Sequence, residues 1–125
     1  MRDYATMRGV LATAANAKSE LCYNDFRPAD QDDKLQEELA RLADDGLLDA
    51  DVLFGGGFGE RTRCRVSGLT DEGREFYKLI ENDIVWRIVH GTLKKANVDV
   101  SYPLLKEVCE EIVKRHVTSF IPDIK

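Results

Sequence analysis

Apolar side chains recur every three or four residues in several stretches of the chain, and this spacing predicts amphipathic helices. The first stretch covers residues 3–18, where Asp3 is a suitable N-cap. The second covers residues 33–46, and Gly46 is expected to end it. Their apolar positions are Tyr4, Met7, Leu11 and Ala14 in the first stretch and Leu35, Leu39 and Leu42 in the second.

Three more helices are predicted in the C-terminal half of the chain. One begins after Thr70 and is interrupted at Asn82 or Asp83, and the next continues to about Leu93. The last covers residues 101–120 and carries apolar side chains over a broad part of its surface. These side chains are Leu104, Leu105, Val108, Cys109, Ile112, Val113, Val117 and Phe120.

Two stretches alternate apolar and polar residues, which is the pattern of a strand with one buried face. They cover residues 47–54 and 61–66, and a glycine-rich segment separates them. We interpret them as the two strands of a hairpin. A third, brief strand is predicted within residues 20–26, where Pro28 limits its length.

A five-residue tip with Phe54 facing Glu60 sets the predicted hairpin register, and the charges of the two strands agree with it. An alignment around a five-residue tip places Asp51 opposite Arg63 and Asp49 opposite Arg65. Opposite charges that face each other across antiparallel strands stabilise the pair. The same register collects one inner face from Leu48, Ala50, Val52, Thr62, Cys64 and Val66.

The glycine-rich segment, GGGFG at residues 55–59, raises the question of a phosphate-binding loop. Such a loop needs a helix directly after its glycines, whereas here a strand follows. We therefore predict a wing tip, with Phe58 at its apex as a candidate contact residue. Arg61 differs from the other two arginines of the second strand because the predicted register gives it no acidic residue.

The predicted order is helix, strand, helix, hairpin and then further helices, which is the order of a winged helix-turn-helix protein. The sequence thus predicts a mainly α fold with a small antiparallel β-hairpin. With 125 residues, 43 % of them hydrophobic, the chain is long enough for one domain. We expect residues 1–70 to form a winged-helix core and residues 71–125 to add C-terminal helices that pack on the same domain.

The net charge of −5 matches that of residues 30–45 alone, which hold seven acids and two bases. In a DNA-binding winged helix, the helix formed by this segment enters the major groove. An acidic face would repel the phosphates of DNA and would suit a basic patch on a protein. The acids are also compatible with a solvated helix face, and this alternative stays open. The predicted partner-binding residues are Glu37, Glu38, Arg41, Asp44 and Phe58.

A dimeric transcriptional regulator that binds DNA is the alternative function. It would contact phosphates through bases on other elements, namely Arg8, Arg27 and Arg61. This alternative rests on analogy with the fold alone.

The residues give little support for catalysis, metal binding or a cofactor. Cys22, Cys64 and Cys109 are widely spaced, so we expect buried free thiols rather than a zinc site or a disulfide framework. His90 and His116 have no nucleophile or acid at a diagnostic spacing. We therefore predict no enzymatic activity, no metal and no cofactor.

Three features predict a cytoplasmic protein with no membrane partner. No stretch approaches eighteen uncharged apolar residues. Polar residues interrupt the N-terminal segment where a signal peptide would need an apolar run. The odd number of cysteines fits a reducing compartment.

The stretch LTDEGREFYKLIENDIVW at residues 69–86, with RDYATMRGVL near the N-terminus and LADDGLLDADV before the hairpin, carries a resemblance. Over most of its length the chain resembles an uncharacterised winged-helix family of bacteria and phages, a domain of unknown function. The resemblance implies a winged-helix fold and an association with prophages or mobile elements, and it assigns no catalytic residues. The segment after Phe26 is short for the second helix of a standard helix-turn-helix. We accordingly expect a non-enzymatic interaction protein that binds or inhibits a protein partner.

The last helix also predicts an assembly state. It has more apolar positions than a winged-helix core needs, and a symmetric contact is the commonest way to bury them. We predict a homodimer through this helix and its neighbour, with Trp86, Val108 and Ile112 at the contact. The alternative is a monomer in which the last helix closes its own core.

Overall fold

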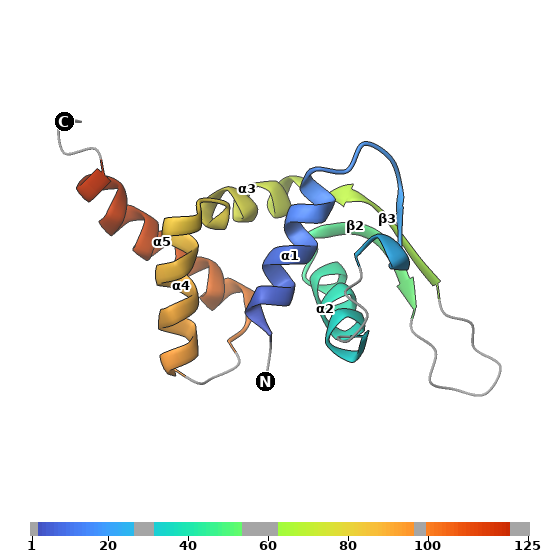
Figure 1. Cartoon of the computed structure of the whole chain (residues 1–125), viewed down its shortest axis with the longest axis horizontal. Coiled ribbons are helices and arrows are strands. Elements are labelled where there is room, and N and C mark those ends of the chain that lie inside the picture. The colour runs from blue at the N-terminus through green and yellow to red at the C-terminus, as the bar shows by residue number, and fades with distance from the viewer. Residues whose placement is uncertain (1–2, 27–31, 54–62, 97–99, 121–125) are drawn as a thin grey trace. The chain divides into compact units, whose positions relative to one another are not determined.

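The computed structural model describes residues 3–26, 32–53, 63–96 and 100–120. The chain divides into two compact units, Arg2–Tyr77 and Lys78–Lys125. Across the described ranges it is mainly helical, with five α-helices and a small three-stranded antiparallel sheet (Figure 1). The predicted mainly α class with a small antiparallel hairpin is therefore confirmed. The predicted packing of residues 71–125 on residues 1–70 stays a prediction.

The first unit contains helices α1 (Tyr4–Ala15) and α2 (Asp32–Asp44) and the start of α3 (Asp71–Ile80). All three helices lie where the apolar spacing predicts them. Asp3 caps α1 as expected, because its carboxylate accepts a hydrogen bond of 3.1 Å from the backbone N–H of Thr6. The apolar positions face inward, and the fully buried ones include Met7, Leu11, Leu35, Leu39, Leu42, Leu47, Val66 and Phe76.

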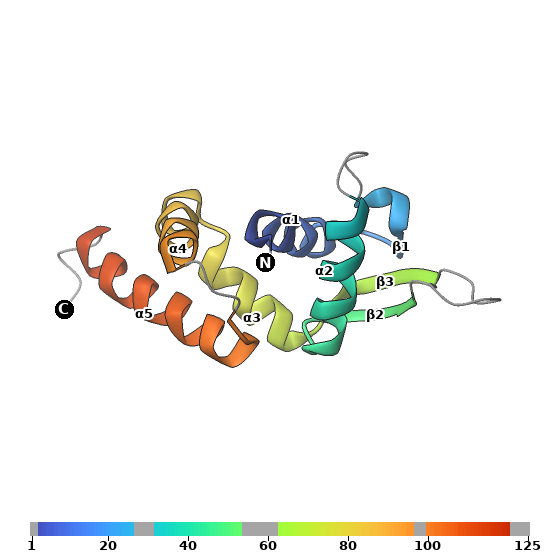
Figure 2. The ribbon, with the colours of Figure 1, turned by 90° about the horizontal axis from the view of Figure 1, so that it is seen from below.

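The sheet consists of β1 (Leu21–Cys22), β2 (Leu48–Leu53) and β3 (Arg63–Leu69) in the order β1-β3-β2. The brief first strand is confirmed, and it leads into a 3-10 helix, η1 (Tyr23–Asp25). Helix α2 packs against β2, while α1 packs against both α2 and β3 (Figure 2).

The predicted hairpin register is wrong by two residues. Asp51 lies opposite Arg65 rather than Arg63, and Asp49 lies opposite Gly68, beyond an irregularity between Asp49 and Ala50. Because side chains alternate along a strand, a slide of two residues keeps the same side chains on the inner face. The apolar pattern therefore could not distinguish the two registers. Both predicted charge pairs are lost, and a different pair of Asp51 with Arg65 replaces them. The predicted tip lies outside the described residues.

A close junction joins the end of α2 to the start of α3. Gly46 has a φ of 78°, and the backbone N–H groups of Gly46 and Leu47 donate to the carbonyls of Ala43 and Leu42 at 3.1 and 3.0 Å. This is a Schellman motif, which satisfies carbonyls at the helix end. The Thr70 hydroxyl donates to the Gly46 carbonyl at 2.6 Å and accepts from the Gly73 N–H at 3.0 Å. One side chain thus connects both helix ends.

We expect Thr70→Val to lower the free energy of unfolding by about 1–2 kcal/mol, because valine keeps the shape but leaves both polar groups without this partner. Urea denaturation followed by far-ultraviolet circular dichroism measures the change. Thr13→Val is the control, since the Thr13 hydroxyl donates to the Gly9 carbonyl within its own helix. Equal effects of the two substitutions would contradict a connecting role for Thr70.

The second unit contains the end of α3 together with α4 (Asp83–Ala96) and α5 (Tyr102–Phe120). The predicted interruption at Asn82 is confirmed, because its side-chain oxygen caps α4 by accepting from the N–H groups of Ile84 and Val85 at 2.9 and 3.1 Å. Helices α4 and α5 pack together. Among the side chains of α4 and α5 that the structure describes, the buried ones are Val85, Trp86, Val89, Leu93, Leu105 and Cys109.

Candidate protein-binding surface

Helix α2 has a buried apolar side and a charged outer side. The outer side carries Lys34, Glu37, Arg41 and Asp44, spaced three or four residues apart. Lys34, Glu37 and Asp44 are exposed and Arg41 is half-buried. We call these four residues the α2 stripe. Its charges alternate, an arrangement that stabilises a helix, and they sum to zero even though residues 30–45 carry a net −5.

The placement of Glu38 on the exposed face of this helix is wrong, because Glu38 is only 3 % exposed. The reason lies in helix geometry. Glu38 is three residues after Leu35 and four before Leu42, and residues at these spacings lie on the same side of a helix. Both leucines are buried, so Glu38 is buried with them. It interacts within the protein and cannot meet a partner's surface.

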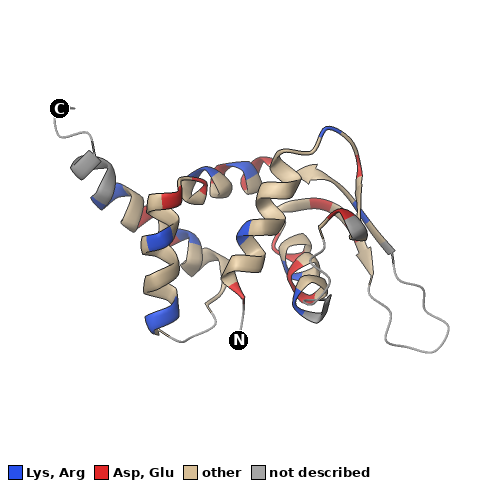
Figure 3. Ribbon diagram, viewed as in Figure 1, with Lys and Arg blue, Asp and Glu red and all other residues tan. Residues whose placement is uncertain are grey.

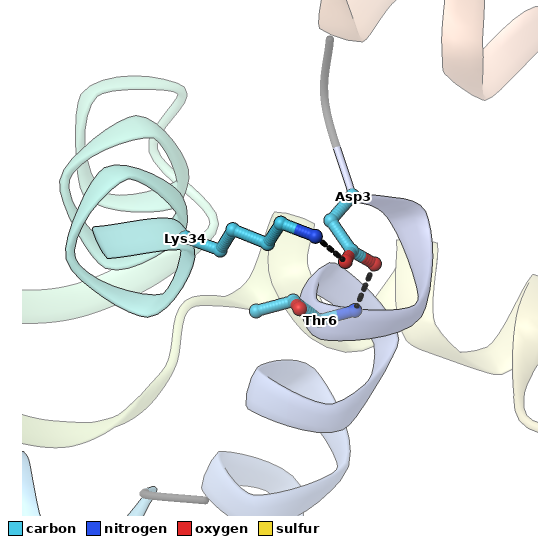
Figure 4. Close-up of polar contacts among 3 residues, drawn as sticks. All are labelled: Asp3, Thr6 and Lys34. Carbon is cyan, nitrogen blue, oxygen red and sulfur yellow. Dashed lines mark hydrogen bonds and ion pairs between the residues drawn. The ribbon is translucent and has the colours of Figure 1, made fainter. Parts of the chain in front are cut away.

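Lys34, at one end of the α2 stripe, is held by the start of α1. Its Nζ lies 3.4 Å from Oδ2 of Asp3, whose Oδ1 accepts the Thr6 N–H (Figure 4). Partial burial raises the pKa of Asp3, but the hydrogen bonds from Thr6 and Lys34 outweigh it and leave the pKa below the ordinary value of 3.8. The Asp3 carboxylate is therefore ionised at neutral pH and forms an ion pair with the Lys34 ammonium.

Strand β2 adds exposed acids outside α2. Asp49 and Asp51 are exposed and alternate with the half-buried Ala50 and Val52. Arg65 is exposed on β3, where it lies opposite Asp51. Acidic residues consequently lie on both the helix and the strand that follows it (Figure 3).

The remaining sequence-predicted contact residues are not brought together in the described part of the chain. Arg8 is half-buried on α1, where it makes interactions within the protein. Phe58, Arg27 and Arg61 lie outside the described residues.

Trp86, predicted at a dimer contact, is instead 8 % exposed in the second unit. Its ring stacks on His90, with centroids 5.2 Å apart and planes 8° from parallel. Val108 and Ile112 are half-buried and line an open groove on the same unit. Trp86 is therefore part of the packing of its own chain, whereas Val108 and Ile112 reach the surface.

The three cysteines are free, but they differ in exposure. The expectation of buried thiols is confirmed for Cys109 and wrong for Cys22, which is exposed and whose Sγ donates to Asp25 Oδ2 at 3.3 Å. Burial raises the pKa of Cys109 to about 12 and that of the half-buried Cys64 to about 11. Because the thiolate is the reactive form, Cys64 and Cys109 are poor nucleophiles at neutral pH.

The described residues contain neither a cluster of metal ligands nor a membrane-spanning helix. No group of three or more His, Cys, Asp or Glu side chains in these ranges is placed to hold a metal ion. Within the same ranges, no helix combines the length and the apolar character that a membrane crossing requires.

Comparison of the chain with protein-family models, with curated proteins and with solved structures finds no match.

Sequence reasoning missed two features of this surface. The burial of Glu38 had a signal, since its spacing from Leu35 and Leu42 places it on the apolar side of the helix. The ion pair between Asp3 and Lys34 had none, because the two residues are far apart in the sequence and only the packing of α1 against α2 brings them together.

Proposed function

We propose that this chain is a non-enzymatic winged-helix protein that binds a basic surface of a partner protein through the α2 stripe and the hairpin. Two features support a winged helix. The first unit follows the order helix, strand, helix and two strands, and its sheet has the order β1-β3-β2. The short η1 occupies the place in the chain where a standard helix-turn-helix has its second helix. An association with phages or mobile elements, implied by the resemblance, belongs to the same proposal.

The observation that carries the proposal is that the described outer side of α2 exposes two carboxylates, Glu37 and Asp44, and has no net positive charge. A DNA-reading helix presents side chains that donate hydrogen bonds to bases and positive charges to phosphates. Here Lys34 is paired with Asp3, and Arg41 lies between Glu37 and Asp44. The exposed carboxylates of Glu37 and Asp44 are suited to arginines and lysines of a protein partner.

Affinity capture from a lysate of the source organism, with the whole chain as bait, tests the proposal. The stripe variant is Glu37→Lys/Asp44→Lys, and the matched control is Glu20→Lys/Glu75→Lys, which changes the net charge equally at exposed positions of the same unit. We expect proteins captured by the wild type and the control to be reduced at least about tenfold on the stripe variant, and to elute as salt is raised.

Equal capture by the stripe variant and the control would contradict the proposal. Electrophoretic mobility shifts with fragments of genomic DNA at low salt test the alternative function. We expect no shift at micromolar protein, because the described outer side of α2 offers no net positive charge. A shift at that concentration that disappears at higher salt would favour the DNA-binding regulator instead.

A further inference from the structure

The second unit has an open groove beside α5 whose lining is partly apolar. Leu104, Val108 and Ile112 of α5 contribute to it, together with Leu79 from the end of α3. The three α5 residues are spaced by four, so they form one stripe along the helix. Leu104 is 47 % exposed, which makes it one of the large apolar side chains that the described chain leaves open to solvent.

We call Leu104, Val108 and Ile112 the groove stripe. It is distinct from the face with which α5 closes its own core. Leu105 and Cys109 are fully buried on that core face, and α5 packs on α4. Helix α5 therefore has apolar side chains on two sides, one buried and one at the surface. A helix with this pattern is typically covered on both sides.

The acidic and basic residues beside the groove stripe are unevenly distributed along α5. Among the charged residues that line the groove, the acids Glu107, Glu110 and Glu111 precede the bases Lys114 and Arg115 along α5. Lys106 precedes these acids and does not line the groove, so residues 106–111 carry a net charge of −2 and residues 114–115 carry +2. On α5, Oε1 of Glu111 lies 3.4 Å from Nε of Arg115, and these side chains are 58 % and 72 % exposed. The charged groups are thus accessible from outside.

We propose that the groove is covered by the groove of a second copy of the chain, with the two α5 helices antiparallel. An antiparallel pair brings the acidic half of each helix beside the basic half of the other, whereas a parallel pair in register would place like charges together. The contact is the same on both copies, as twofold symmetry requires. This inference is independent of the proposed function, because it uses no residue of the first unit.

Sedimentation equilibrium of the whole chain between about 1 and 100 μM tests the dimer, a range that covers moderate affinities. We expect a dimer for the wild type, and at least a tenfold weaker dimer for Leu104→Glu, since a charge would then be buried in the apolar groove. Ile84→Glu is the matched control, because Ile84 is 51 % exposed on α4 and does not line the groove. Both side chains are exposed in one copy, so both variants should fold, which circular dichroism verifies.

A wild type that stays monomeric at 100 μM would overturn the proposal, and so would a dimer that Ile84→Glu weakens and Leu104→Glu does not. Charge reversal tests the orientation. Glu107→Lys and Lys114→Glu should each weaken the dimer, and the double variant should restore it, because the antiparallel partner carries the reversed charges too. Failure of the double variant to regain dimerisation would overturn the antiparallel arrangement.

Discussion

Gly73→Ala should lower the free energy of unfolding by about 2–3 kcal/mol, the size of effect produced by forcing extra atoms into a packed core. A Cβ at Gly73 would overlap the carbonyl oxygen of Leu47 and would lie 3.0 Å from its carbonyl carbon. These are backbone atoms, so they cannot turn aside as the end of a flexible side chain would. The start of α3 would have to move away from Leu47, and the Thr70 hydrogen bonds depend on the same junction.

The sign of this effect is informative because helix propensity alone predicts the opposite. Alanine is favoured over glycine inside a helix by about 1 kcal/mol. Gly9→Ala supplies the comparison, since Gly9 lies within α1, is exposed, and would gain a Cβ with no atom within 4 Å. We expect Gly9→Ala to stabilise the protein by about 0.5–1 kcal/mol. Urea denaturation followed by circular dichroism measures both, and stabilisation by Gly73→Ala would contradict the close approach.

Glu38→Lys should destabilise the protein by about 3 kcal/mol, whereas Glu37→Lys should change its stability by less than about 0.5 kcal/mol. The two residues are neighbours on one helix, but Glu38 is 3 % exposed and Glu37 is exposed. A lysine at position 38 would bury an ammonium group on the side of α2 that carries the buried Leu35 and Leu42. Position 37 stays in water with either charge.

Thermal and urea denaturation of both lysine variants measure the difference in their stability. Glu38→Gln removes the negative charge but keeps the shape of the side chain, so it separates the effect of the charge from the effect of side-chain size. The result also bears on partner binding. Loss of a partner on substituting Glu38 would report unfolding, so the charge reversals that test the α2 stripe are placed at Glu37 and Asp44. Similar stability of the two lysine variants would contradict the burial of Glu38.

Apolar periodicity by itself determined the positions of the helices and strands. The spacing of Leu35, Leu39 and Leu42 predicted α2, and the alternation around Ala50 and Val52 predicted β2. Local signals also marked helix ends, because Asp3 and Gly46 act on backbone groups within a few residues of themselves. Such capping interactions join residues that are close in the sequence, so the local sequence alone is enough to predict them.

Tertiary structure decided which polar side chains are exposed to solvent and which residues they pair with. The hairpin register needed it, because alternation is unchanged by a slide of two residues and the charges near Asp49 and Asp51 fit more than one alignment. The pairing of Lys34 with Asp3 and the burial of Trp86 depend on how helices pack, which involves residues far apart in the chain. The net charge of a segment is a property of its sequence. The charge that a surface shows is fixed only when packing decides which side chains are buried or paired.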